Sequence, residues 1–350
     1  MPLRTTTIGA YPKPKGSPVP NWPDLGEMRR TAPTRAYDAY LEAALNPSAL
    51  SALDRMTARV VREQVDLGID VPTDGEIRRE HYVYYHCRHV SGVSFTQLTT
   101  KTMRGGGWRA EVPTVIAPLE AGAPFLVRDW QVAQAATRND IKITIPGALT
   151  VADTIADNYY GDRAQFCRAW ADCINVEIRR LAAAGCRWIQ IDEPVFARQV
   201  GAALEFGTDC LNRAFAGLGP EVNKVVHICC GYPAGLDAEG GDKADRRSYF
   251  ELAPALDQSA VNAVSIEDAH RHNDLRLLER YQNTRVILGS IEIARSAVEP
   301  AELIATRLSQ ALDHIDAHRL LVAPDCGLVL LPHEIAKQKL SNMVTAANSF

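Results

Sequence analysis

Segment 227–229, His-Ile-Cys, carries two side chains whose types and spacing suit metal chemistry. It ends a β-branched apolar run that begins at Val225, and the turn residue Gly231 follows closely. This pattern predicts a short strand. Residues two apart in a strand face the same side, so His227 and Cys229 would present an imidazole and a thiol together. Both are ligands that zinc prefers, although an isolated pair of this kind also fits a buried strand with an inert cysteine.

Other apolar runs also end in groups that bind metals. The run at 263–266 ends in Glu267, and the run at 320–324 is followed by Asp325 and Cys326. If these runs are strands of one parallel barrel, their carboxyl ends meet at one face. One nitrogen, one oxygen and two thiolate sulfurs form a plausible zinc site. The candidate ligands are His227, Cys229, Glu267 and Cys326.

Glu267 has an alternative role. A lone carboxylate at the end of an apolar strand would be costly to bury without a partner. A salt bridge to Arg271 or Arg276 would satisfy it equally well.

Eight apolar runs alternate with helical stretches along the chain. With the turns that end some of them, the runs cover residues 5–8, 69–76, 141–147, 188–194, 225–229, 263–267, 286–291 and 320–327. The clearest helical stretches cover residues 51–67, 164–184 and 300–318, and a last one starts near 334. The alternation predicts an α/β fold, specifically a (β/α)8 TIM barrel. An open doubly wound sheet is the alternative, but the count of eight and the lack of Gly-x-Gly-x-x-Gly after the first run favour the barrel.

We expect one catalytic barrel over residues 1–350, with residues 77–125 inserted after the second strand as a loop or hairpin region. The insertion contains a glycine run at 105–107 and three histidines, His81, His86 and His89. Their spacing could bind a second metal ion, but packing among the neighbouring aromatic residues is the favoured interpretation.

The composition limits the function classes. Apolar residues make up 46% of the 350 residues and charged residues 23%, as in soluble globular proteins. The net charge of −4 gives no reason to expect nucleic acid or an anionic membrane surface as a partner. No run approaches the roughly 18 apolar residues of a membrane span, and the N-terminus lacks the apolar core of a signal peptide. The eight cysteines are therefore expected to be reduced thiols in the cytoplasm.

Six segments, in order along nearly the whole chain, resemble the catalytic barrel of cobalamin-independent methionine synthase. They are Thr6-Thr7-Ile8-Gly9, Asp74-Gly75-Glu76 with Arg79, Gln190-Ile191-Asp192-Glu193-Pro194, His227-Ile228-Cys229, Val264-Ser265-Ile266-Glu267 and Pro324-Asp325-Cys326-Gly327. Larger members of that family carry an additional N-terminal barrel, so this chain resembles the short, single-barrel members.

The resemblance implies a zinc-dependent methyltransferase that methylates the thiol of homocysteine to form methionine. It implies zinc at His227, Cys229, Glu267 and Cys326. Glu76 and Asp192 would meet the substrate amino group as catalytic residues, and Gly9, Ala10 and Glu193 complete the expected substrate-binding set. Zinc coordination lowers the pKa of a thiol, which keeps the substrate sulfur nucleophilic. Both acidic residues could instead be structural carboxylates that cap turns.

Three departures from the family pattern concern the substrates. Ala10 stands where the family usually has a serine that helps to hold the amino-acid carboxylate. Ala294 stands where the large enzymes have a histidine that helps to protonate the folate leaving group. No tryptophan stands directly after the third strand to stack a pterin, and Tyr159 and Tyr160 are the nearest aromatic residues there. The methyl donor could therefore be methyltetrahydrofolate bound differently, methylcobalamin on a corrinoid protein, or another small methyl compound.

Two other functions remain open. The barrel could alkylate another small thiol, such as coenzyme M, because Ala10 leaves room for a different acceptor. It could also be a non-catalytic, zinc-stabilised barrel that binds a partner, since four protein ligands close a structural zinc site. Glu76 and Asp192 would then have no purpose beside the metal. A zinc hydrolase is disfavoured because the site offers two thiolates and no open position for water.

Overall fold

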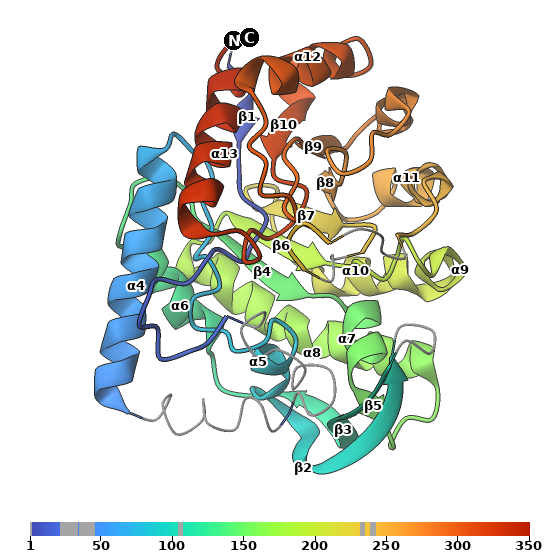
Figure 1. Cartoon of the computed structure of the whole chain (residues 1–350). Helices are drawn as coiled ribbons and strands as arrows, with labels where there is room; N and C mark the ends of the chain where they lie inside the picture. The colour runs from blue at the N-terminus through green and yellow to red at the C-terminus, as the bar shows by residue number, and fades with distance from the viewer. Residues whose placement is uncertain (1, 22–33, 35–45, 104–107, 232–234, 239–242) are drawn as a thin grey trace.

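A curled, parallel sheet of seven strands forms the centre of the molecule (Figure 1). The computed structural model describes residues 2–21, 34, 46–103, 108–231, 235–238 and 243–350. In spatial order the strands are β1 (Arg4–Thr5), β10 (Leu320–Ala323), β9 (Arg285–Gly289), β8 (Ala263–Ile266), β7 (Asn223–Ile228), β6 (Trp188–Asp192) and β4 (Lys142–Pro146). Each pairs in parallel with its neighbours, so all carboxyl ends lie at one edge.

Helices surround the outside of the curled sheet in Figure 1. The longer ones are α4 (Pro47–Asp66), α6 (Leu126–Gln134), α8 (Arg163–Ala184), α11 (Arg247–Asp257), α12 (Ala301–Leu312) and α13 (His333–Ala347). Shorter helical segments are α5 (Tyr84–Cys87), α7 (Ala148–Thr154), α9 (Val200–Ala202), α10 (Thr208–Ala214), the π-helix Ala203–Gly207 and the 3₁₀ helices Leu275–Arg280 and Ala317–Arg319. The expected helix at 300–318 is therefore shorter, because α12 ends at Leu312 and a separate 3₁₀ turn follows.

Capping residues explain where the predicted helices begin and end. The Asn46 side chain accepts a hydrogen bond from Ser48 N at the start of α4, and Pro47 occupies the first turn. The Asp162 side chain accepts from Gln165 N at the start of α8. That helix ends at Gly185, whose φ of 113° is a left-handed conformation that glycine adopts without steric cost.

The expected second strand does not form a regular strand. Residues 71–73 lie between the two edge strands, and each end makes one isolated parallel bridge: Val71 with Thr6 and Thr73 with Lys142. Pro72 has no N–H group to donate, so a continuous ladder cannot form through it. Its carbonyl still accepts a hydrogen bond from Lys142 N at 2.9 Å.

One contiguous cluster of buried apolar side chains comes from β6 to β10 and from the segments that contain Ile8 and Val71. Its members are Ile8, Val71, Trp188, Val225, Ala263, Ile287, Leu321 and Ala323. Trp188 is completely buried, and the guanidinium groups of Arg4 and Arg285 lie 5.1 and 5.3 Å from the centre of its ring. Buried polar side chains, including His227 and Glu267, lie at or directly after the carboxyl ends of the strands, which makes this the polar end of the sheet.

An antiparallel hairpin lies outside the central sheet. Its strands β2 (Val90–Met103) and β3 (Trp108–Ala121) form a separate three-stranded sheet with β5 (Ala156–Asp157). The Lys101 ammonium joins the hairpin to the end of α7 by donating to the carbonyls of Ala152 and Ile155, at 2.6 and 2.7 Å. The glycine run at 105–107 lies outside the described residues.

The three histidines near this hairpin pack with aromatic residues. The His81 ring stacks on Tyr84 and the His89 ring on Phe125, with centroids 4.2 and 4.1 Å apart. Among the described residues, these histidines are not part of any cluster that could hold a metal. No helix in the described part of the chain has the length and apolar character needed to cross a membrane.

Candidate metal and substrate site

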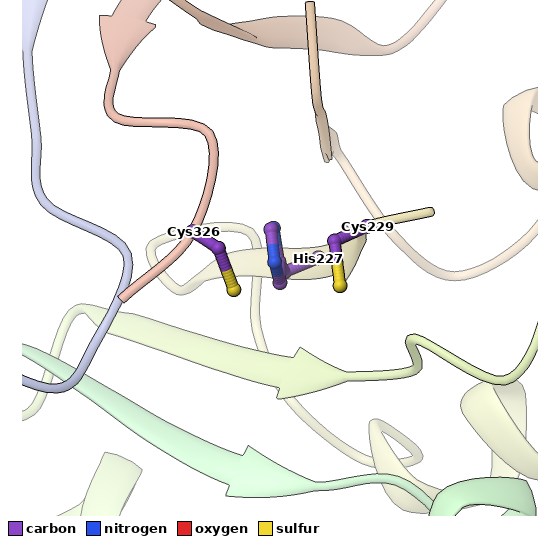
Figure 2. Close-up of side chains that lie close together, drawn as sticks. All are labelled: His227, Cys229 and Cys326. Atoms are coloured by element: carbon purple, nitrogen blue, oxygen red, sulfur yellow. The ribbon is translucent and has the colours of Figure 1, made fainter. Parts of the chain in front are cut away.

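His227, Cys229 and Cys326 meet at the carboxyl edge of the sheet (Figure 2). His227 lies in β7, Cys229 directly follows that strand, and Cys326 comes from the segment after β10. Their ligand atoms all lie within 4.8 Å of one another, and His227 and Cys229 are buried. The alternation of side chains along a strand places the first two on one face, as predicted. The parallel order of the strands then brings Cys326 across the end of the interior.

The imidazole of His227 is oriented for binding a metal. Its Nδ1 lies 3.0 Å from the Ser265 hydroxyl, and the two residues are register partners on β7 and β8. Its Nε2 is buried and has no hydrogen-bond partner in the described structure. A buried nitrogen without a partner is costly, and a metal ion between the two sulfurs and this nitrogen would satisfy it. The three donors therefore fit a soft divalent ion such as zinc.

The thiols of Cys229 and Cys326 differ in acidity. A hydrogen bond from Cys326, together with His227, holds the pKa of Cys229 well below its ordinary value. The same interaction raises the pKa of Cys326, as does its burial. Cys229 is therefore the more acidic thiol of the pair, and both sulfurs would have to be thiolates to bind a metal.

Glu267 lies beside this cluster without joining it. The side chain is buried directly after β8, and one oxygen forms an ion pair with the Lys243 ammonium. The other oxygen accepts a hydrogen bond from Cys230 N at 3.2 Å. Neither arginine considered as an alternative partner contacts it, because Arg271 donates to the Ala244 carbonyl and Arg276 pairs with Asp274. Lys243 could not be predicted from sequence, because it lies in a glycine-rich connection far from any apolar run.

Asp325 explains how Cys326 is held in place. Its carboxylate accepts hydrogen bonds from the backbone N–H groups of Asp268, Ala269 and His270, at 2.9, 2.9 and 2.6 Å. These bonds connect the segment after β10 to the segment that carries Glu267. Sequence reasoning placed Asp325 at a strand end but did not predict this role.

Asp192 lies at the end of β6, one strand away from the metal-binding cluster. It is the register partner of His227, and Gln190 Nε2 donates to its Oδ1 at 2.7 Å. Burial raises the pKa of Asp192 to about 7, with His227 opposing and Glu76 reinforcing that shift.

Glu76 adopts an unusual backbone conformation, with φ of 56°. Its Oε1 accepts a hydrogen bond from the Thr144 hydroxyl at 2.7 Å and lies 3.3 Å from Arg79 Nη1. Gly9 lies against the same oxygen: a Cβ on Gly9 would be 2.6 Å from Oε1. The absence of a Cβ at Gly9 therefore leaves room for the Glu76 carboxylate in this position.

The remaining predicted substrate residues, Gly9, Ala10 and Glu193, differ in whether their polar groups already have hydrogen-bond partners. The backbone N–H groups of Gly9 and Ala10 have no hydrogen-bond partner within the described ranges. Both oxygens of Glu193 are engaged at the start of α7. They accept from Leu149 N, Thr150 N and the Thr150 hydroxyl at 3.0, 3.0 and 2.7 Å.

Comparison with known proteins shows which family the chain matches. The family described as cobalamin-independent synthase, catalytic domain, matches residues 3–206 and 247–349. The methionine synthase of Saccharolobus islandicus is 30% identical over 346 residues, which cover 98% of this chain and 93% of that protein. The methionine synthase of Sulfurisphaera tokodaii is 29% identical over 345 residues, which cover 98% and 90%.

Solved structures show the same fold. The B12-independent methionine synthase from Shewanella sp. W3-18-1, in complex with selenomethionine, superposes with a TM-score of 0.85 at 29% identity. That match covers 100% of this chain and 97% of the other. A putative B12-independent methionine synthase from Listeria monocytogenes has a TM-score of 0.71 at 18% identity, covers 99% and 98%, and supports the fold alone. The chain therefore belongs to the family of cobalamin-independent synthase catalytic domains, and it is an enzyme of the methyltransferase class.

Proposed function

We propose that this protein is a zinc-dependent methyltransferase that transfers a methyl group to the thiol of homocysteine to form methionine. The observation that carries the proposal is the buried, unpartnered Nε2 of His227 beside the sulfurs of Cys229 and Cys326. The names of the curated relatives and the selenomethionine in the Shewanella structure support the same reaction.

His227, Cys229 and Cys326 would hold the zinc ion, with Glu267 as the fourth ligand once it separates from Lys243. Bound zinc would lower the pKa of the substrate thiol, so that the sulfur acts as a thiolate near neutral pH. Two cysteine ligands make the metal a weak Lewis acid, which suits a nucleophilic sulfur better than the activation of water.

The chain's own residues would bind and orient the amino acid. The carboxylates of Glu76 and Asp192 would bind the substrate ammonium, and the free N–H groups of Gly9 and Ala10 would bind its carboxylate. Glu193 would act indirectly, because its two oxygens are engaged with α7. The engaged carboxylate keeps the end of β6, and with it Asp192, in position.

The proposal includes one (β/α)8 barrel over residues 1–350. The bridges of Val71 and Thr73 to the two edge strands support a ring of eight segments, and the 77–125 region would be an insertion after the second of them. All eight cysteines are free, which fits the reducing cytoplasm.

The methyl donor would be methyltetrahydrofolate or a methylated corrinoid. Ala294 is buried and offers no acid for a folate leaving group. Growth of a methionine auxotroph that expresses this protein, with and without cobalamin, separates the two donors.

Metal analysis and cobalt substitution test the proposal. Protein purified without chelators is expected to contain one zinc ion per chain. Titration of the cobalt-substituted protein with homocysteine should change the thiolate charge-transfer band, whereas coenzyme M should not. Cys326→Ser should lose the metal, while Cys230→Ser, at the neighbouring buried thiol outside the cluster, should keep it. Metal-free wild-type protein, or equal binding in both variants, would contradict the proposal.

A further inference from the structure

The backbone at Glu76 is in the left-handed conformation, which residues other than glycine rarely adopt. Gly75 and Glu76 are both left-handed, with φ of 68° and 56°. The Asp74 side chain stabilises this turn by accepting a hydrogen bond from Glu76 N at 3.1 Å. A left-handed residue other than glycine costs about 1 kcal/mol, and such residues cluster at functional sites. The turn places the Glu76 carboxylate over Gly9, inside the polar end of the sheet.

One oxygen of this carboxylate is held by two consecutive hydrogen bonds, and the donor and acceptor in each are determined by the chemistry of the groups. Arg79 Nη1 donates to the Thr144 hydroxyl oxygen at 2.8 Å, and the Thr144 hydroxyl donates to Glu76 Oε1 at 2.7 Å. A guanidinium can only donate, and a carboxylate can only accept. The Thr144 hydroxyl proton must therefore point to Glu76, and Oε1 has no freedom to rotate toward another partner.

The second oxygen of the carboxylate is left free. Glu76 Oε2 has no hydrogen-bond partner in the part of the chain that the structure describes, and it is not sealed off from solvent. With Oε1 held in this way, Oε2 is the oxygen left to accept a hydrogen bond from a ligand. The charge of Glu76 also helps to raise the pKa of Asp192, the other carboxylate proposed to bind the ammonium.

Arg79 does not cancel the charge of Glu76. Its side chain is almost completely buried, and its Nη2 lies 3.6 Å from an oxygen of Asp74. Burial by itself would lower the pKa of Arg79, but Asp74 and Glu76 raise it above the ordinary value, so the guanidinium stays charged. Because Arg79 is shared by two carboxylates, Glu76 keeps negative charge for a cationic ligand.

We propose that Thr144 and Arg79 are positioning residues that make Glu76 selective for thiols carrying an ammonium group. The inference rests on the proposed function, in which Glu76 binds the substrate amino group. The hydroxyl of Thr144 aims the free oxygen, and the guanidinium of Arg79 fixes the hydroxyl. Loss of either leaves the carboxylate in place but lets it turn away from the ammonium.

Two thiols that differ only in the ammonium group test this proposal. Homocysteine and 4-sulfanylbutyrate have the same thiol and carboxylate, and their binding can be followed by the absorption of the cobalt-substituted protein. In Thr144→Val the dissociation constant of homocysteine is expected to rise about tenfold or more, as expected when a hydrogen bond to a charged group is lost. That of 4-sulfanylbutyrate should change less than twofold. Thr144→Ser keeps the hydroxyl and should restore the selectivity, and Arg79→Lys should lose it.

Equal weakening of both thiols in Thr144→Val, or failure of Thr144→Ser to restore selectivity, overturns the proposal. A second measurement keeps the test independent of the thiol chemistry: calorimetry with methionine and with 4-(methylsulfanyl)butyrate, its analogue without the amino group. If homocysteine leaves the cobalt absorption of the wild type unchanged, the proposed reaction fails, and the calorimetry still decides the role of Thr144. If the wild type binds the two thioethers equally, the positioning role is wrong.

Discussion

Lys142 is a buried charge for which the proposed reaction has no use. It lies in β4, its side chain is completely buried, and its Nζ has no hydrogen-bond partner among the described residues. Burial lowers the pKa of Lys142 to about 7, although Asp192 opposes the shift. The lysine therefore destabilises the fold whenever it is protonated, because the unfolded chain binds that proton more tightly.

Replacement of this lysine should stabilise the protein in a pH-dependent way. An unfolded lysine has a pKa of about 10.4. The penalty is therefore complete below pH 7 and disappears as the pH rises from 7 toward 10. Lys142→Met is expected to raise the free energy of unfolding by roughly 1 to 4 kcal/mol at pH 6.5 and by much less at pH 9.5. Denaturant unfolding at the two pH values measures this difference.

Lys339 provides the matched control. It is also completely buried, but its ammonium lies 2.8 and 2.9 Å from the two oxygens of Glu299. Lys339→Met leaves that carboxylate without its partner and should lower the stability. A gain from Lys142→Met that is equal at both pH values would contradict the charge argument.

Lys243 should compete with the metal for Glu267. Its ammonium forms an ion pair with the carboxylate proposed as the fourth ligand. Lys243→Met removes the competitor, so the affinity for zinc is expected to rise about tenfold, measured by competition with a chromophoric chelator. Lys337→Met, at a lysine that pairs with Glu334 on α13, should leave the affinity unchanged. A lower zinc affinity in Lys243→Met would show that the lysine supports the site instead.

The two kinds of site residue differ in how far sequence predicts them. His227 and Cys229 follow from local geometry, because residues two apart in a strand share a face. Cys326 required the further assumption of a parallel ring, which the order of the strands supports. Lys243 and Thr144 gave no sequence signal, because each acts through a contact with a residue distant along the chain.

At the scale of the element, β9 needs a glycine where it passes the segment that carries Cys326. A Cβ on Gly289 would lie 2.0 Å from Asp325 Oδ1 and 2.9 Å from Asp325 Cα. Gly289→Ala is therefore expected to displace this backbone, to weaken zinc binding by at least tenfold and to lower the stability by about 1 to 3 kcal/mol. Calorimetric unfolding and metal titration measure the two effects.

Gly201 in α9 is the matched control, because a Cβ there would contact nothing within 4 Å and the residue has no positive φ. Gly201→Ala should keep the zinc affinity and leave the stability equal or slightly higher. Full metal binding in Gly289→Ala would mean that Asp325 does not position Cys326.

The strands differ in how accurately the sequence predicts them, and the difference has a physical reason. Strands β6 and β7 lie within two residues of their expected ends, because each is a compact apolar run with a clear turn after it. The second expected strand is wrong as a strand because Pro72 interrupts the ladder, so only two isolated bridges remain. The periodicity of apolar residues predicts which side chains are buried, but it does not show whether each backbone N–H group needed for a ladder is present.

At the scale of the whole molecule, the candidate metal site connects distant parts of one sheet. His227 lies in β7 and Cys229 directly follows it, while Cys326 follows β10, with β8 and β9 between the two strands. An ion bound here would link these strands at their carboxyl ends. The metal would therefore stabilise the more polar half of the interior.

Zinc should accordingly raise the stability of the whole chain. A ligand that binds only the folded state at 1,000 times its dissociation constant adds about 4 kcal/mol. For a chain of this length the midpoint of thermal unfolding should rise by roughly 10 °C. Scanning calorimetry with zinc and with a chelator measures the shift, which Cys326→Ser should abolish and Cys230→Ser should keep. An unfolding midpoint that does not respond to zinc in the wild type would mean that the three residues meet without binding a metal.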